Sequence, residues 1–219
     1  LVVSSIALRD EVQRSRPDLI PVLLRPFFHS YQGMQDPSQP PYYQCSILGS
    51  DPRHFAMRTN RKNTDAAHRD FPELPPMGAQ QIEALDLLDE LMLSDKLCYS
   101  MTLERGDMQL LNNYVALHSR TPFTDFQNAD QKRHLLRLWL AIPGSQPLPS
   151  DWEEYFGDVR SGAVRGGLRG SFITPEFLAY ERRQAEALGM HYRPWQPPKV
   201  PASMHSRLAE AGQATTRRP

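Results

Sequence analysis

One arginine, Arg137, lies inside an otherwise apolar run of the sequence that extends from Leu135 to Ile142. A charged group within a buried strand costs several kcal/mol unless it meets an anion. The guanidinium group is a planar fork that matches the two oxygens of a carboxylate. The run therefore predicts either an ion pair with an internal Asp or Glu, or a buried site for a carboxylate ligand.

A second arginine, Arg133, precedes Arg137 by four positions. Side chains at even spacing share one face of a strand, and four positions separate their Cα atoms by about 13 Å. A molecule with two carboxylates can contact both guanidinium groups in that arrangement, so a dicarboxylate is a plausible ligand on geometric grounds.

A histidine, His118, follows the short apolar stretch 115–117. A lone histidine at the end of a strand is more often a packed, hydrogen-bonded residue than a ligand. Here the polar side chains of Asn112, Asn113 and residues 119–121 crowd the same strand end. Such a cluster is typical of the open end of a barrel, where binding sites collect, and it makes His118 a candidate ligand.

The elements that must position these residues are predicted to be mostly short strands. Proline is frequent, with 20 residues among 219, and it disfavours long helices. Period-two patterns predict strands, with 42–48 and 54–59 as the two arms of a hairpin; the predicted strands are 1–3, 27–31, 42–48, 54–59, 97–101, 108–111, 115–117 and 135–142. Helices are predicted at 5–16, 18–25, 79–93 and 175–188, and proline-rich loops at 35–41 and 60–77. The fold class that fits is mainly β with flanking helices (α+β), as a two-sheet antiparallel barrel or jelly roll.

The composition excludes several classes of protein. Lys and Arg number 25, and Asp and Glu number 25, so the net charge is zero and a nucleic-acid partner is not expected. No apolar stretch approaches the ~20 residues that span a membrane. The two cysteines, Cys45 and Cys98, are too few for a disulfide scaffold, so we expect a reducing, cytoplasmic location. Self-association into a homo-oligomer stays open.

Two segments together resemble a known family. Residues 106–123, GDMQLLNNYVALHSRTPF, followed by 133–140, RHLLRLWL, resemble the C-terminal half of the TauD/TfdA-like Fe(II)- and 2-oxoglutarate-dependent dioxygenases. The opening residues 1–12 resemble the family's segment just after its first metal motif. The resemblance implies a double-stranded β-helix (jelly roll), incomplete at the N-terminus, over residues 1–143. Residues 144–219 are then a C-terminal extension that is partly helical and has a flexible end.

The resemblance also assigns roles. By position, His118 resembles the family's distal iron ligand. Arg137 resembles the arginine that pairs with the remote carboxylate of 2-oxoglutarate, and Arg133 the arginine near the carboxylate that chelates iron. The implied cofactors are Fe(II) and 2-oxoglutarate. The implied partners are O2 and a small-molecule substrate that is acidic and otherwise unidentified.

The sequence departs from the family at the iron site. The family holds iron with a His-x-Asp/Glu pair and a distal histidine, and the pair precedes the segment that opens this chain. We therefore expect the sequence to be a fragment that is inactive alone. The tripeptide His68-Arg69-Asp70 matches the His-x-Asp pattern. Its predicted position in a proline-rich loop favours a solvent-exposed role instead.

Two other readings stay open. The chain is also compatible with a non-catalytic β-barrel that binds a partner or an anion and never holds iron. A zinc hydrolase would need His118 to converge with His68 and Asp70.

Overall fold

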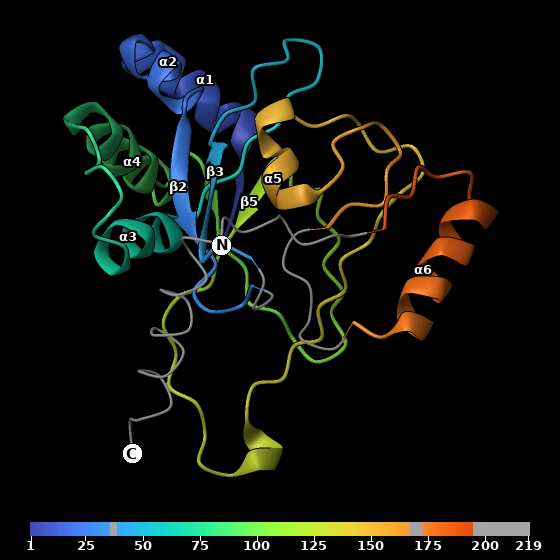
Figure 1. The fold of residues 1–219 in the computed structure, drawn as a ribbon. Helices are drawn as coiled ribbons and strands as arrows, with labels where there is room; N and C mark the ends of the chain where they lie inside the picture. Colours follow the sequence, from blue (N-terminus) through green and yellow to red (C-terminus); the bar gives the residue numbers. More distant parts are fainter. Residues whose placement is uncertain (36–38, 167–172, 195–219) are drawn as a thin grey trace.

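The computed structural model describes residues 1–35, 39–166 and 173–194. These residues form two small sheets surrounded by helices (Figure 1). No helix in the described part of the chain is both long and apolar enough to cross a membrane. In chain order the elements are β1 (Val2–Ser4), α1 (Ser5–Ser15), η1 (Pro17–Leu19), α2 (Ile20–Leu23), β2 (Pro26–Ser30), β3 (Tyr42–Ser46), α3 (Arg61–Asp70), α4 (Ala79–Met92), β4 (Cys98–Tyr99), β5 (Ala116–His118), η2 (Ala129–Gln131), η3 (Ser150–Trp152), α5 (Glu153–Phe156) and α6 (Pro175–Ala187).

The first sheet has three antiparallel strands in the order β4-β1-β5. The central strand β1 leads straight into α1, because the Ser4 side chain accepts a hydrogen bond from the Ala7 backbone N–H and caps the helix. This turn from strand to helix packs Leu8 and Val12 into the core, where both are buried. The N-terminal strand, the first helix and the helix at 79–93 that the sequence predicts are therefore confirmed.

The second sheet pairs β2 with β3, from Pro26 opposite Ser46 to Ser30 opposite Tyr42. The predicted pairing of 42–48 with 54–59 is wrong over most of its length, since only the bridge between Leu48 and Met57 joins the two segments as a β-pairing. The neighbour of β3 is β2, the strand that precedes it along the chain.

Carboxylates close the other edge of β3. The Ser46 N–H donates to Asp151 at 2.7 Å, and the Gln44 N–H donates to Glu154 at 3.1 Å. Side chains of η3 and α5 thus take the place of a further strand, because edge N–H groups need partners.

The second of the two buried clusters is built around aromatic rings on β3 and α5. The Arg58 guanidinium lies among them, 4.3 Å from the Tyr155 ring centroid and 5.4 Å from that of Tyr43. It donates hydrogen bonds to the Tyr43 hydroxyl and to Cys45 Sγ. Leu148 and Trp152 belong to the same cluster, so the segment after residue 144 packs directly on β3.

Residues 61–70 form helix α3, which corrects the predicted loop over 60–77. The Asn60 side chain accepts a hydrogen bond from the Asn63 N–H and caps the helix. Thr64, Ala66 and Ala67 are buried against β2. The segment is strongly polar and its buried face holds only small side chains, so its composition resembles that of a surface loop.

Residues 118–144 are exposed throughout. The predicted strands 108–111 and 135–142 are wrong, because the structure places both outside regular secondary structure. Figure 1 shows this part of the chain extending away from the sheets, with the short helix η2 at its far end. A strand forms only beside a neighbour that completes its hydrogen bonds, and no described strand lies beside 135–142. The described fold is mixed α/β with small sheets, and the closed jelly roll is not confirmed.

The buried histidine of β2 predicts an acid sensitivity of the fold. His29 is 2% exposed and its Nδ1 lies 3.1 Å from Thr64 Oγ1. Burial, with a smaller effect of the Arg58 charge, lowers the pKa of His29 from 6.5 to about 3. Between these values the unfolded chain takes up a proton that the folded chain does not, so stability falls as the pH falls through this window. We expect a loss of about 2 kcal/mol between pH 7 and pH 5 from this residue.

Urea unfolding followed at several pH values measures this loss. His29→Gln should flatten the dependence between pH 7 and pH 5, whereas the exposed His134→Gln should leave it as in the wild type. Equal slopes in the wild type and in His29→Gln would show that His29 has the same pKa in the folded and in the unfolded chain.

Candidate functional site

His118 ends strand β5, opposite Val2 of the central strand β1. The strand is tied at both ends: the Ser119 N–H donates to the Leu1 carbonyl at 3.1 Å, and the Ser5 N–H donates to the Val115 carbonyl at 3.0 Å. The predicted strand 115–117 is thus confirmed, displaced by one residue. The sheet fixes the backbone of His118 and leaves its side chain on the surface.

The charge of Arg137 acts on His118. The pKa of His118 is lowered from its ordinary value, first because its ring is partly withdrawn from water, then because positive charges at Arg137 and at the Leu1 amino group repel the protonated form. Such repulsion weakens quickly with distance in water, so the two charged groups lie in the same part of the structure.

Among the residues that the structure describes, the guanidinium of Arg137 has no acidic partner. Arg137 is exposed, and no Asp or Glu in the described part of the chain forms an ion pair with it. The predicted ion pair with an internal acid is therefore wrong for the described residues. The structure also does not show the alternative, a buried carboxylate site, because Arg137 lies on the surface.

Arg133 is placed differently from the expectation that it shares a strand face with Arg137. Its guanidinium lies over the Phe123 ring, 5.6 Å from the centroid, and its backbone N–H donates to Asp125. Arg120 contacts the same ring at 4.6 Å. The sequence analysis grouped Arg120 only with the polar residues that follow His118. Its position two residues after that histidine was the signal that could have marked it as a candidate site residue.

The described residues contain no cluster of three or more His, Cys, Asp or Glu side chains that is able to hold a metal ion. An iron site of the facial-triad type takes three protein ligands, and His118 supplies one. The described residues alone therefore do not fit iron. The roles of His118, Arg133 and Arg137 in binding iron and 2-oxoglutarate stay predictions.

His68 and Asp70 do not join His118. Both lie on α3 and not in the predicted loop. The Asp70 carboxylate is engaged by Arg69 at 2.7 and 2.8 Å, and the His68 ring packs edge-on against Phe28. Within the described ranges, the convergence that a zinc hydrolase would need is absent.

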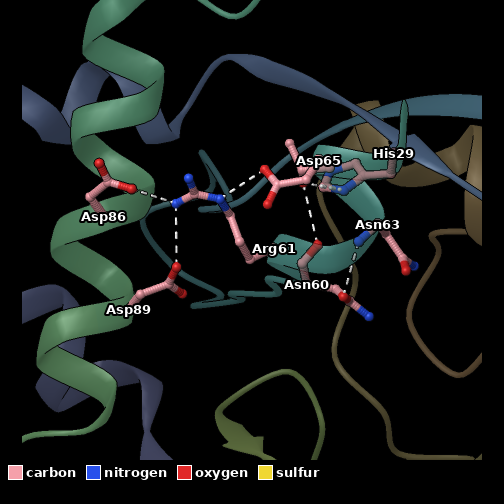
Figure 2. A network of polar contacts seen from close by, with 8 residues as sticks. His29, Asn60, Arg61, Asn63, Asp65, Asp86 and Asp89 are labelled. Atoms are coloured by element: carbon pink, nitrogen blue, oxygen red, sulfur yellow. Dashed lines mark hydrogen bonds and ion pairs between the residues drawn. The ribbon is translucent and has the colours of Figure 1, made fainter. Parts of the chain in front are cut away.

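A separate polar network ties α3 to α4, as Figure 2 shows. Arg61 donates to Asp65 at 2.9 Å on its own helix, and to Asp86 at 2.7 Å and Asp89 at 3.3 Å on α4. Burial raises the pKa of Asp89. One guanidinium bridging three carboxylates explains the network as a contact between helices.

Comparison with known proteins gives three matches. The family model described as taurine catabolism dioxygenase TauD, TfdA family, matches residues 1–139. A protein named FR-33289 synthase, from Streptomyces rubellomurinus, is 27% identical over 169 residues, which are 74% of this chain and 48% of that protein. A taurine hydroxylase-like protein, SAT17, from Stachybotrys chartarum is 29% identical over 167 residues, which are 71% of this chain and 41% of that protein. The chain thus spans about half, or less than half, of the length of these curated relatives.

Proposed function

The chain belongs to the TauD/TfdA family of dioxygenases, and from this premise we propose that it contributes the 2-oxoglutarate side of an Fe(II)- and 2-oxoglutarate-dependent oxygenase. In this proposal Arg137 binds the remote carboxylate of 2-oxoglutarate and Arg133 lies toward the other carboxylate. His118 is the one iron ligand that the described residues supply. The reaction is the hydroxylation of a small, acidic organic substrate.

The observation that carries the proposal is the pair formed by His118 and Arg137. His118 is fixed at the end of a strand, the positive charge of Arg137 helps to lower the pKa of its imidazole, and within the described residues Arg137 forms no ion pair. A guanidinium in this state is ready to take up a carboxylate, and charge-assisted contacts of this kind are stronger than neutral hydrogen bonds. Arg120 and Arg133 add positive charge on the same segment.

The relatives' names support the class of reaction. One is called a synthase and the other hydroxylase-like, with taurine in its name. Taurine carries a sulfonate, so an anionic substrate agrees with the cationic side chains along residues 120–137.

Binding of 2-oxoglutarate to the chain tests the proposal directly. Isothermal titration calorimetry at low salt should detect 2-oxoglutarate, whereas 2-oxobutyrate, which lacks the remote carboxylate, should bind roughly 10-fold or more weakly. Equal affinities for the two acids, or no heat with either, would contradict the role given to Arg137.

A second candidate function is supported by the absence of a three-ligand metal cluster among the described residues. A binding module that takes an anion would also bind 2-oxoglutarate. Iron distinguishes the two: with Fe(II), O2, 2-oxoglutarate and a panel of small acids, an oxygenase releases succinate and a binding module does not. Because the described residues supply one ligand, turnover requires further ligands from outside them, so the assay should use the longest available form of the protein.

A further inference from the structure

The segment after residue 144 contacts the start of strand β5 through one tyrosine. Tyr114 lies two residues before β5, the strand that ends at His118. The Phe156 ring of α5 packs edge-on against the Tyr114 ring, with centroids 5.9 Å apart. The Arg165 guanidinium lies over the same ring, 5.3 Å from its centroid. Both contacts come from residues beyond 139, where the match to the family model ends.

Arg165 is held in place by the chain around it. Its Nη2 donates to the Arg160 carbonyl at 3.0 Å and also to the Gln146 carbonyl. The Gln146 side chain donates in turn to the Phe55 carbonyl at 2.6 Å. Because the guanidinium is a rigid planar group, these hydrogen bonds fix the plane that lies over the tyrosine.

The contacts of Tyr114 form a closed path through separate parts of the chain. The Met57 N–H donates to the Tyr114 carbonyl at 2.9 Å. From Met57 the path runs along the chain to Phe55 and its hydrogen bond with Gln146. It returns through the Gln146 carbonyl to Arg165, and so to the tyrosine ring. Tyr114 is therefore held both by its backbone and by its ring.

Strand β5 gains from support outside its own sheet. It has three residues, and its pairing with β1 is continued by the hydrogen bond from the Ser119 N–H to the Leu1 carbonyl. Such a short pairing opens readily, because few backbone hydrogen bonds have to break. Contacts that fix the residues just before the strand therefore help to keep His118 in place.

We propose that Arg165 is a positioning residue, which links the segment 144–166 to Tyr114 and thereby holds strand β5 and the backbone of His118. The importance of Arg165 for a reaction rests on the proposed function, whereas its effect on β5 does not. Substitution of Arg165 should loosen β5 from a distance, without changing a group on the strand itself.

Amide hydrogen exchange followed by NMR on the purified chain tests the proposal at three backbone N–H groups. Two belong to Met57 and Ser119, which are bonded to the two ends of the supported segment. The third belongs to the buried Leu88, inside helix α4. Arg165→Met should speed exchange at Met57 and Ser119 by roughly 10-fold or more and leave Leu88 unchanged.

A conservative variant and a matched control separate this role from a general loss of charge. Arg165→Lys keeps a cation over the ring and loses the planar fork, so it should give intermediate rates. Arg193→Met is the control, since Arg193 is 56% exposed and binds Glu153 of the same segment at 2.8 Å. It should leave all three rates as in the wild type.

Tyr114→Leu removes the same contact from the other side and should reproduce the pattern of Arg165→Met. The double variant should exchange no faster than the faster single variant, because both substitutions break one contact. If Arg165→Met does not fold, Tyr114→Leu and Arg165→Lys carry the same comparison.

Three results would overturn the proposal: wild-type rates at Met57 and Ser119 in the Arg165 variants, equal acceleration at all three amides, or single effects that multiply in the double variant. Calorimetry with 2-oxoglutarate on the wild type separates this proposal from the proposed function. Unchanged amides in the variants of a chain that binds 2-oxoglutarate would overturn the positioning role alone. Faster exchange in the variants of a chain that does not bind it would support the positioning role and contradict the proposed function.

Discussion

Replacing Trp152 with alanine is expected to lower the free energy of unfolding by about 3–5 kcal/mol. The indole is fully buried in the aromatic cluster. Its ring stacks on Phe156 with centroids 5.8 Å apart, and Arg58 lies 5.9 Å away. Its Nε1 donates to the carbonyl and the hydroxyl of Ser46, both at 3.0 Å. Alanine would leave a large cavity and unpaired polar groups on strand β3.

Urea denaturation followed by circular dichroism measures this loss. Tyr180→Ala on α6, where the tyrosine is 53% exposed, is the control and should change stability by about 0.5 kcal/mol at most. Trp152→Phe should retain much of the packing and lose the two hydrogen bonds, giving an intermediate value. Similar small effects for Trp152→Ala and Tyr180→Ala would show that the segment after residue 144 is not part of the folded core.

The elements that the sequence predicts well are those whose signals are local. α4 has an apolar stripe at helical spacing, and α6 begins at a Thr174 cap followed by proline. Ser4 caps α1 directly after a short strand. Predicting each of these helices needs only the residues within one element, because capping and period depend on neighbours along the chain.

The elements that the sequence misses depend on distant partners. Residues 135–142 have the composition of a buried strand, yet no described strand lies beside them. The aromatic cluster joins Tyr43 to Trp152 across more than one hundred positions, and no local pattern links the two. The predicted C-terminal extension stays a prediction as a domain; its residues beyond 194 lie outside the described part of the chain, as do 167–172 of the Gly/Arg-rich stretch.

The prediction of the candidate site also depended on strands that need distant partners. The roles predicted for His118 and Arg137 stay predictions, and the structure adds that the charge of Arg137 lowers the pKa of His118. The expected alignment of Arg133 with Arg137 assumed a regular strand, and the structure instead places Arg133 over Phe123. The expected geometry of the two arginines failed because the strand on which it depended is absent from the described structure.

Arg137→Ala is expected to weaken the binding of 2-oxoglutarate by roughly 10- to 100-fold, since it removes one charged hydrogen-bonding partner of a carboxylate. Arg137→Lys should give an intermediate affinity, because lysine keeps the charge and loses the planar fork. Arg53→Ala is the matched control: its side chain is 81% exposed and lies in the turn after Asp51. Titration calorimetry against 2-oxoglutarate compares the four proteins.

The same variant makes a second prediction that does not involve any ligand. Because the positive charge of Arg137 helps to lower the pKa of His118, Arg137→Ala should raise that pKa toward its ordinary value, and Arg137→Lys should raise it less. Titration of the His118 ring by NMR measures the shift. If affinity falls while the pKa of His118 stays unchanged, the arginine binds the carboxylate away from the histidine, and the two groups do not form one site. If the pKa rises and the affinity does not change, the groups are neighbours but the co-substrate binds elsewhere. Only the two changes together support a single site that joins iron ligand and co-substrate.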